Sequence, residues 1–210
     1  MTAVQVAASL WSVPATDRPA TADRLAAAGL RRWHWDVSDG VLAAPGGFGP
    51  AEAAALMRRT DLPGEAHLMV TEPLTVLHAW AAVCDRVIVH AEAAEWPEAV
   101  RQIAAAGSRP GVALSPGTST AVLAALPDDV AVLVMSIVPG QAGTPFSPAT
   151  PGRLDALRRP GRDLGVDGGV DRARARECGR HGATWVVSGS ALCGDPDAAG
   201  WLAEVERAEG

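Results

Sequence analysis

Histidine and aspartate residues stand near the ends of several short apolar segments. His34 and Asp36 lie two residues apart near the end of 32–37, His67 lies toward the end of 64–70, and Asp167 closes 163–167. Two neutral imidazoles and two carboxylates suit a divalent ion such as zinc, iron, manganese or cobalt, and with a 2+ ion their charges sum to zero. A lone His-x-Asp pair is frequent by chance. The metal-site prediction for His34, Asp36, His67 and Asp167 therefore depends on a fold that brings them together.

Glycine clusters follow two of the later segments. Gly168 and Gly169 come directly after Asp167, and Ser188-Gly-Ser-Ala191 follows the segment 184–188. Glycine at the entry to a helix lets backbone N–H groups approach an anion closely, and the helix N-terminus favours negative charge. A tight turn explains either cluster by itself. Together, at the two loops where barrel enzymes usually bind phosphate, they predict a phosphate site.

Composition removes several classes of mechanism. All 18 basic residues are arginine, so the chain offers no lysine for a Schiff base, a pyridoxal-phosphate enzyme, a general base or a Walker phosphate loop. The net charge of −6 and the scarcity of aromatic residues argue against a nucleic-acid partner. No apolar run approaches the roughly 18 residues needed to cross a membrane, and the start does not resemble a signal peptide. Three cysteines without a C-x-x-C spacing indicate free thiols in a reducing cytoplasm.

The elements that must position these residues alternate strictly along the chain. Eight apolar or β-branched segments predict strands at 4–9, 32–37, 64–70, 86–91, 109–114, 130–136, 163–167 and 184–188. Helical candidates follow them at 21–28, 50–58, 73–83, 95–106, 118–125, 148–158, 172–181 and 195–208. This alternation predicts an α/β fold with a parallel sheet, and eight units allow it to close into a single-domain (β/α)8 TIM barrel over residues 1–210. A doubly wound open sheet is the alternative, but no G-x-G-x-x-G follows the first strand.

A closed barrel would gather the polar strand ends on one face, where the active sites of such enzymes lie. Ser9, His34, Asp36, His67, His90 and Asp167 all stand near such ends. Because side chains alternate along a strand, His34 and Asp36 should point into the barrel mouth, while Trp33 and Trp35 pack toward the helices. For His90, a hydrogen-bonded core histidine is favoured over a metal ligand.

A set of motifs resembles the ribulose-phosphate 3-epimerase family, in order and at its spacing, from about Ser9 to Gly194. The motifs are His34-x-Asp36-Val-x-Asp39-Gly40, Phe48-Gly-Pro50, His67-Leu-Met69, Gly111-Val-Ala-Leu-x-Pro-Gly-Thr118, Met135-Ser-x-x-Pro-Gly140, Val166-Asp-Gly-Gly169 and Gly189-Ser-Ala191. Each motif alone is weak, but the set is highly specific.

The resemblance implies a ribulose-phosphate-binding barrel with one divalent metal ion that inverts C3 of D-ribulose 5-phosphate to give D-xylulose 5-phosphate. It assigns His34, Asp36, His67 and Asp167 to the metal, and Asp36 and Asp167 also to proton transfer through an enediolate. The substrate contacts that it implies are Ser9, His67, Gly140, Gln141, Ala142, Gly143, Gly168, Gly169, Gly189 and Ser190. The partner is then a small sugar phosphate, and a homo-oligomer stays possible.

The chain departs from the family pattern around the sugar rather than at the metal. Ser38 replaces the usual methionine, and Val138, Gln141 and Ala142 change the sixth loop. Two alternatives therefore stay open. One is a paralogue acting on another or modified ketose phosphate, such as allulose 6-phosphate, and the other is a catalytically silent sugar-phosphate-binding protein.

Overall fold

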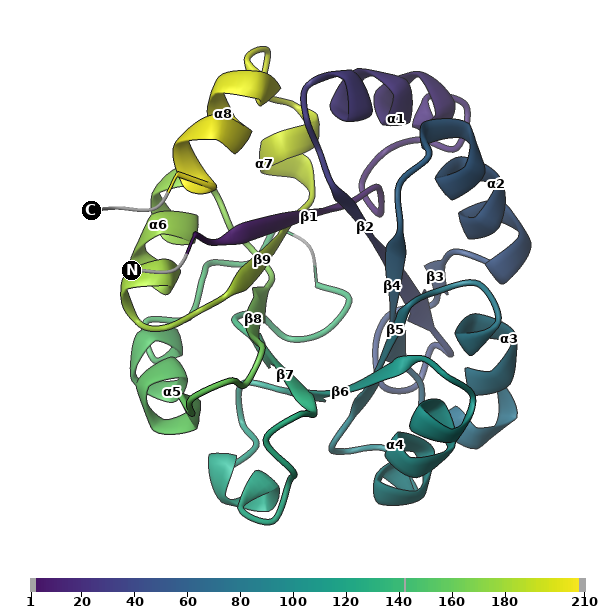
Figure 1. The fold of residues 1–210 in the computed structure, drawn as a ribbon, viewed down its shortest axis with the longest axis vertical. Coiled ribbons are helices and arrows are strands. Elements are labelled where there is room, and N and C mark those ends of the chain that lie inside the picture. The colour runs from purple at the N-terminus through teal and green to yellow at the C-terminus, as the bar shows by residue number, and fades with distance from the viewer. Residues whose placement is uncertain (1–2, 142, 208–210) are drawn as a thin grey trace.

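Parallel strands close into a barrel at the centre of the molecule (Figure 1). The computed structural model describes residues 3–141 and 143–207. Its barrel strands are β1 (Gln5–Ser9), β2 (Arg32–Ser38), β4 (Gly64–Met69), β5 (Arg86–His90), β6 (Arg109–Leu114), β7 (Ala131–Met135), β8 (Leu164–Asp167) and β9 (Trp185–Ser188). Each pairs in parallel with its neighbours, and β1 pairs with both β2 and β9. The sheet is therefore closed, which confirms the predicted (β/α)8 barrel over the open-sheet alternative.

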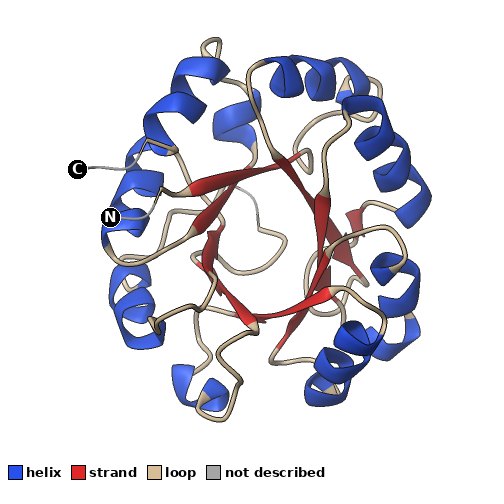
Figure 2. Cartoon of the chain, viewed as in Figure 1, coloured by secondary structure: helices blue, strands red, loops and turns tan. Residues whose placement is uncertain are grey.

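Helices form an outer ring around these strands (Figure 2). They are α1 (Arg18–Ala27), α2 (Pro50–Thr60), α3 (Leu77–Ala81), α4 (Trp96–Ala105), α5 (Thr150–Leu157), α6 (Arg172–Arg180), α7 (Ser190–Cys193) and α8 (Ala198–Val205). Local sequence explains where several begin. Pro50 stands in the first turn of α2, where its missing N–H costs nothing, and the Asp171 carboxylate caps α6 by accepting from the Arg174 N–H at 2.8 Å. Among the described residues, no helix is both long and apolar enough to span a bilayer.

The structure differs from the predicted helices at four places. Helix α1 begins at Arg18 rather than at Thr21. The segment 118–125 forms only a short 3-10 helix, η2 (Thr120–Leu123), because β-branched residues and Pro127 leave too little helix-forming sequence between strands. The segment 73–83 divides into a 3-10 turn, η1 (Pro73–Thr75), and α3. The last predicted helix begins at Ala198 rather than Asp195, and the short α7 precedes it.

An additional two-residue strand, β3 (Gly46–Gly47), pairs antiparallel with the end of β2. Its glycines fit the close approach of the two strands. A Cβ atom at Gly47 would lie 2.2 Å from the Asp36 carbonyl oxygen, and φ at this residue is +106°. The connection after β2 is thereby held against the strand that carries Asp36.

Apolar side chains pack against both faces of the closed sheet. Outside it, Trp33 and Trp35 are fully buried in the core between strands and helices. Inside it, a second cluster contains Ile88, Leu133 and Trp185. A Cβ at Gly165 would lie 2.2 Å from Cε2 of Trp185, so glycine leaves the space that the indole occupies. The barrel interior is thus a packed core that supports the residues at its mouth.

Candidate active site

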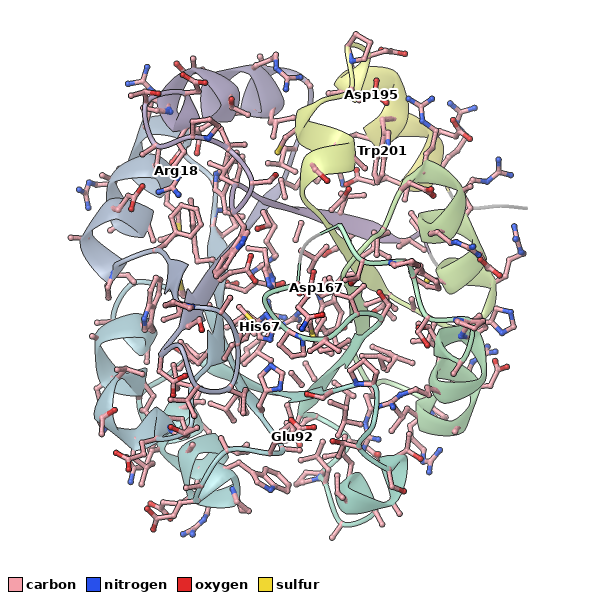
Figure 3. All side chains as sticks on the ribbon, turned by 180° about the vertical axis from the view of Figure 1, so that it is seen from behind. Arg18, His67, Glu92, Asp167, Asp195 and Trp201 are labelled. Carbon is pink, nitrogen blue, oxygen red and sulfur yellow. The ribbon has the colours of Figure 1, made fainter. Side chains whose placement is uncertain are left out.

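The four residues expected to bind metal come together at the carboxyl ends of three strands. His34 and Asp36 lie on β2, His67 on β4 and Asp167 at the end of β8. One ligand atom from each lies within 4.8 Å of the other three. Figure 3 shows His67 and Asp167 near the barrel axis. The alternation along β2 explains the arrangement, since the tryptophans beside His34 and Asp36 face the helices instead.

The two imidazoles turn different ring nitrogens toward the carboxylates. His34 Nε2 lies 3.4 Å from Asp36 Oδ1 and 4.0 Å from Asp167 Oδ2. His67 Nδ1 lies 3.3 Å from Asp36 Oδ1 and 3.6 Å from Asp167 Oδ2. His34 Nε2 is buried without a hydrogen-bond partner. A buried, unpartnered imidazole nitrogen aimed at two carboxylates fits a divalent ion held by nitrogen and oxygen donors.

A buried carboxylate stands behind His34. Glu65 Oε1 lies 2.8 Å from His34 Nδ1 and also accepts the indole N–H of Trp185 at 3.2 Å. The other Glu65 oxygen accepts from Arg86, again at 3.2 Å. With Nδ1–H bonded to Glu65, the lone pair of His34 Nε2 is left to face the cluster.

The two aspartates have pKa values displaced in opposite directions. Burial would raise the pKa of Asp36, but favourable electrostatic interactions with the imidazoles of His34 and His67 hold it well below its usual range. Burial raises the pKa of Asp167 to about 7, and the neighbouring charge of Asp36 adds to this effect. Two adjacent carboxylates repel when both are ionised, so a cation between them would stabilise the doubly ionised pair.

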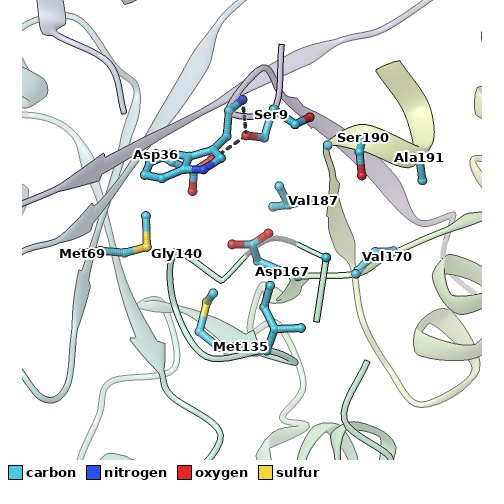
Figure 4. A pocket seen from close by; sticks show the side chains of 17 residues that line it. Ser9, Asp36, Met69, Met135, Gly140, Asp167, Val170, Val187, Ser190 and Ala191 are labelled. Atoms are coloured by element: carbon cyan, nitrogen blue, oxygen red, sulfur yellow. Dashed lines mark hydrogen bonds between the residues drawn. The ribbon is translucent and has the colours of Figure 1, made fainter. Parts of the chain in front are cut away.

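A cavity of about 240 Å³ opens above the cluster (Figure 4). Asp36 and Asp167 line its floor, and Ser9 Oγ donates a 2.5 Å hydrogen bond to Asp36 Oδ2. Of the residues expected to contact substrate, the lining includes Ser9, Gly140, Gly143, Gly168, Gly169, Gly189 and Ser190. His67 is fully buried beneath them. Gln141 is exposed and outside the lining, and Ala142 lies outside the described residues.

At two glycines on the rim of the cavity, the side chain of any other residue would clash with neighbouring atoms. Gly168 has φ +100°, and a Cβ there would lie 2.4 Å from Ile137 Cγ1. Gly140 has φ +73°, and its Cβ would lie 2.8 Å from the Ala44 backbone nitrogen. Ser136 Oγ donates to the Gly168 carbonyl oxygen, which fixes the turn after β8. Both turns therefore bring main chain to the edge of the cavity.

The geometry agrees with the comparison with known proteins. Residues 5–193 match the model of the "Ribulose-phosphate 3 epimerase family". The chain belongs to the ribulose-phosphate 3-epimerase family. It is 38% identical over 168 residues to the ribulose-phosphate 3-epimerase of Chlamydia muridarum, covering 75% of this chain and 74% of that protein. It is 33% identical over 202 residues to the cytoplasmic isoform of ribulose-phosphate 3-epimerase from Oryza sativa subsp. japonica, covering 91% of this chain and 88% of that protein.

A solved structure shares the fold at lower identity. The 3-hexulose-6-phosphate synthase from Salmonella typhimurium aligns with a TM-score of 0.76 and 16% identity, covering 97% of each chain. At this identity the likeness shows the barrel architecture alone.

Sequence reasoning missed most of the apolar lining in this member of the epimerase family. Met69, Met135, Ile137 and Val187 face the cavity beside the acids. Trp11, in the loop after Ser9, also lines it. Their positions in the sequence could have indicated them, because the methionines and Val187 stand at or near the carboxyl ends of barrel strands, where side chains line the active site.

Proposed function

We propose that the protein is a metal-dependent epimerase that inverts C3 of D-ribulose 5-phosphate to give D-xylulose 5-phosphate. One observation carries the proposal. Two carboxylates, Asp36 from β2 and Asp167 from β8, enter one cavity from separate strands and share a pair of buried imidazoles. Inversion at a carbon next to a ketone needs one group to remove a proton from one face and another to return a proton to the opposite face.

His34, Asp36, His67 and Asp167 would hold the ion. A divalent ion supplies Lewis-acid stabilisation of the negative charge that develops when C3 loses its proton. Zinc, iron, manganese and cobalt all suit two nitrogen and two oxygen donors. We propose that Asp36 and Asp167 also act as the proton carriers, each using a carboxylate oxygen directed into the cavity. Neither role needs a lysine, which the chain lacks.

The apolar lining has a role in stereochemistry. Met69 and Met135 are each 2% exposed and line the cavity close to the two acids. Their side chains limit the access of water to the planar enediolate left after proton removal. The returned proton then comes from a positioned carboxyl group rather than from solvent.

We propose that the phosphate binds at the edge formed by Gly168, Gly169, Gly189 and Ser190. All four line the cavity, on the connections after β8 and β9. The left-handed backbone of Gly168 and Gly169, with φ of +100° and +61°, allows main chain to approach an anion closely. Main-chain N–H groups and the Ser190 hydroxyl would bind phosphate despite the net charge of −6.

Proton exchange tests this proposal directly. Metal-loaded protein in D₂O should convert ribulose 5-phosphate to xylulose 5-phosphate and place deuterium at C3, observed by NMR. Asp36→Asn and Asp167→Asn should each lower turnover at least about 1,000-fold, because each removes one proton carrier. Asp61→Asn is the matched control, since Asp61 is exposed at the left-handed end of α2, a conformation that asparagine tolerates.

Other outcomes separate the alternatives. Exchange with another ketose phosphate but not with ribulose 5-phosphate would support the divergent paralogue. Tight binding without exchange would support a silent sugar-phosphate-binding protein. Near-normal turnover in either aspartate variant would disprove the two-carboxylate mechanism.

A further inference from the structure

A line of hydrogen-bonded side chains runs from His67, one of the four candidate metal ligands, to the loop after β5. His67 Nε2 lies 2.9 Å from His90 Nε2, and His90 Nδ1 lies 2.9 Å from Glu92 Oε2. The two rings are nearly parallel, with 19° between their planes. Both imidazoles are fully buried, while the Glu92 side chain is 23% exposed. In Figure 3, Glu92 lies farther from the barrel axis than His67.

The chemistry of these groups gives the line a direction. A glutamate carboxylate is ionised at neutral pH and only accepts hydrogen bonds, so His90 must donate from Nδ1. A neutral imidazole that donates from one nitrogen accepts at the other. His90 Nε2 therefore accepts, and His67 must donate from its own Nε2. The lone pair of His67 is then on Nδ1, which lies 3.3 Å from Asp36 Oδ1 and 3.6 Å from Asp167 Oδ2. A lone pair and a carboxylate oxygen cannot bond to each other, so this arrangement is complete only when a cation lies between Nδ1 and the carboxylates.

Glu92 is itself held from the far side. Its Oε1 accepts the backbone N–H of Ser115 at 2.9 Å and the hydroxyl of Thr118. A backbone N–H cannot reverse its role as a donor. One oxygen of Glu92 therefore accepts only from the loop after β6, and the other accepts from His90.

His34 is also oriented by a carboxylate, but without an intervening imidazole. His34 Nδ1 meets Glu65 directly, and its Nε2 faces the cluster. His67 presents the opposite nitrogen, and an added imidazole links it to its carboxylate. Each histidine of the cluster thus has a carboxylate that selects which nitrogen is free. Carboxylates that orient ligand histidines in this way are a general feature of metal sites.

We propose that His90 and Glu92 are positioning residues that hold His67 with its proton on Nε2, so that Nδ1 is free to bind the divalent ion. The inference rests on the proposed function, since it concerns the same metal site. Neither residue touches the ion or the substrate in this proposal. Their effect on the ion passes through His67 alone.

The hydrogen bonds from His67 through His90 to Glu92 form a relay whose direction can be tested. Glu92→Gln should reverse the direction of these hydrogen bonds rather than break them. The amide oxygen should stay on the Ser115 N–H, because an NH₂ group there would meet another donor. The NH₂ group then takes the place of Oε2 and donates to His90 Nδ1. His90 must next donate from Nε2, and His67 must accept there, which places the His67 proton on Nδ1. Binding an ion at Nδ1 would oppose this arrangement.

The first readout is metal affinity, measured calorimetrically with zinc or cobalt. We expect the dissociation constant of Glu92→Gln to rise about 10- to 100-fold over that of the unsubstituted protein. Glu95→Gln is the matched control, because it makes the same chemical change at an exposed residue three positions along the chain. Its affinity should be unchanged. Equal affinities for both variants would overturn the relay.

The second readout is the tautomer of His90, followed by two-bond ¹H–¹⁵N NMR on protein labelled at histidine, both metal-free and zinc-loaded. The unsubstituted protein should carry the His90 proton on Nδ1, and the folded Glu92→Gln protein should carry it on Nε2. An Nε2 proton on His90 in the unsubstituted protein overturns the relay, whether or not the protein is active. Failure of the proposed function is distinct, since it appears as absent metal binding or C3 exchange in the unsubstituted protein.

Discussion

The Ser9 hydroxyl donates a 2.5 Å hydrogen bond to Oδ2 of Asp36, and this bond joins the carboxyl ends of the neighbouring strands β1 and β2. Both residues are buried, with exposures of 5% and 7%. The parallel register aligns Ser9 with His34, two residues before Asp36. Closure of the barrel thus brings a donor to the proposed proton carrier and restricts the rotation of its carboxylate.

Ser9→Ala should lower kcat for epimerisation about 10- to 100-fold. A hydrogen bond to a charged group contributes about 1.5–3 kcal/mol, and its loss leaves Asp36 free to rotate. Steady-state kinetics on ribulose 5-phosphate would measure the change. Ser108→Ala is the control, because Ser108 is also buried and hydrogen-bonded but lies before β6 at the other end of the barrel. A similar fall in kcat for both variants would show that the Ser9 effect is one of general stability.

Removal of divalent ions should lower the melting temperature and abolish activity, and zinc or cobalt should restore both. An ion at 100 times its dissociation constant stabilises the folded state by about 2.7 kcal/mol. For a chain of this size, that corresponds to a shift of about 5–10 °C. Differential scanning fluorimetry would record it. His34→Gln should lose the shift, whereas His181→Gln, at the end of α6, should keep it. A shift retained by His34→Gln would place the ion elsewhere.

Gly168→Ala should destabilise the protein and raise KM for the sugar phosphate. The positive φ costs an alanine roughly 1–2 kcal/mol, and the clash with Ile137 adds about 1–3 kcal/mol. Gly161→Ala separates these causes, because Gly161 has φ +79° but no atom within 4 Å of its added Cβ. Urea denaturation and kinetics would measure both quantities. Equal destabilisation by the two variants, with KM unchanged, would contradict the crowding of the turn after β8.

The three cysteines should react slowly with iodoacetamide while the protein is folded. Burial raises the pKa of Cys84 and Cys178 to about 12, and that of Cys193 to about 11. Since the thiolate is the reactive form, alkylation at pH 8 should be at least about 100-fold slower than in urea, and should speed up as the pH rises. Mass spectrometry at timed intervals would show it. Rapid modification of Cys84 or Cys178 in the folded protein would contradict their burial.

The barrel was predictable because its signal is local. Segments such as 109–114 carry apolar residues of the right length between helical patterns, and the structure places a strand at Arg109–Leu114. The alternation of Trp33, His34, Trp35 and Asp36 likewise fixed which side chains face inward. The strand β3 gave no such signal, since Gly46 and Gly47 form it only by pairing with β2.

The candidate site was predictable in its acids and imidazoles but not in its surroundings. His90 was expected to be a hydrogen-bonded core histidine, and its bonds to His67 and Glu92 confirm this. The direction of those bonds depends on Ser115 and Thr118, which are more than 20 residues away in sequence. Gln141, which was expected to contact substrate, is exposed and outside the cavity lining, because sequence spacing does not encode the conformation of its loop.

The candidate site is divided unequally between the two halves of the chain. Strands β1 to β5 carry Ser9, His34, Asp36 and His67, whereas β8 carries Asp167 and leads into the glycines at the cavity edge. A cut between β5 and β6 would therefore yield two fragments, each lacking part of the proposed catalytic set. Any activity recovered on mixing the two fragments would therefore report their reassembly.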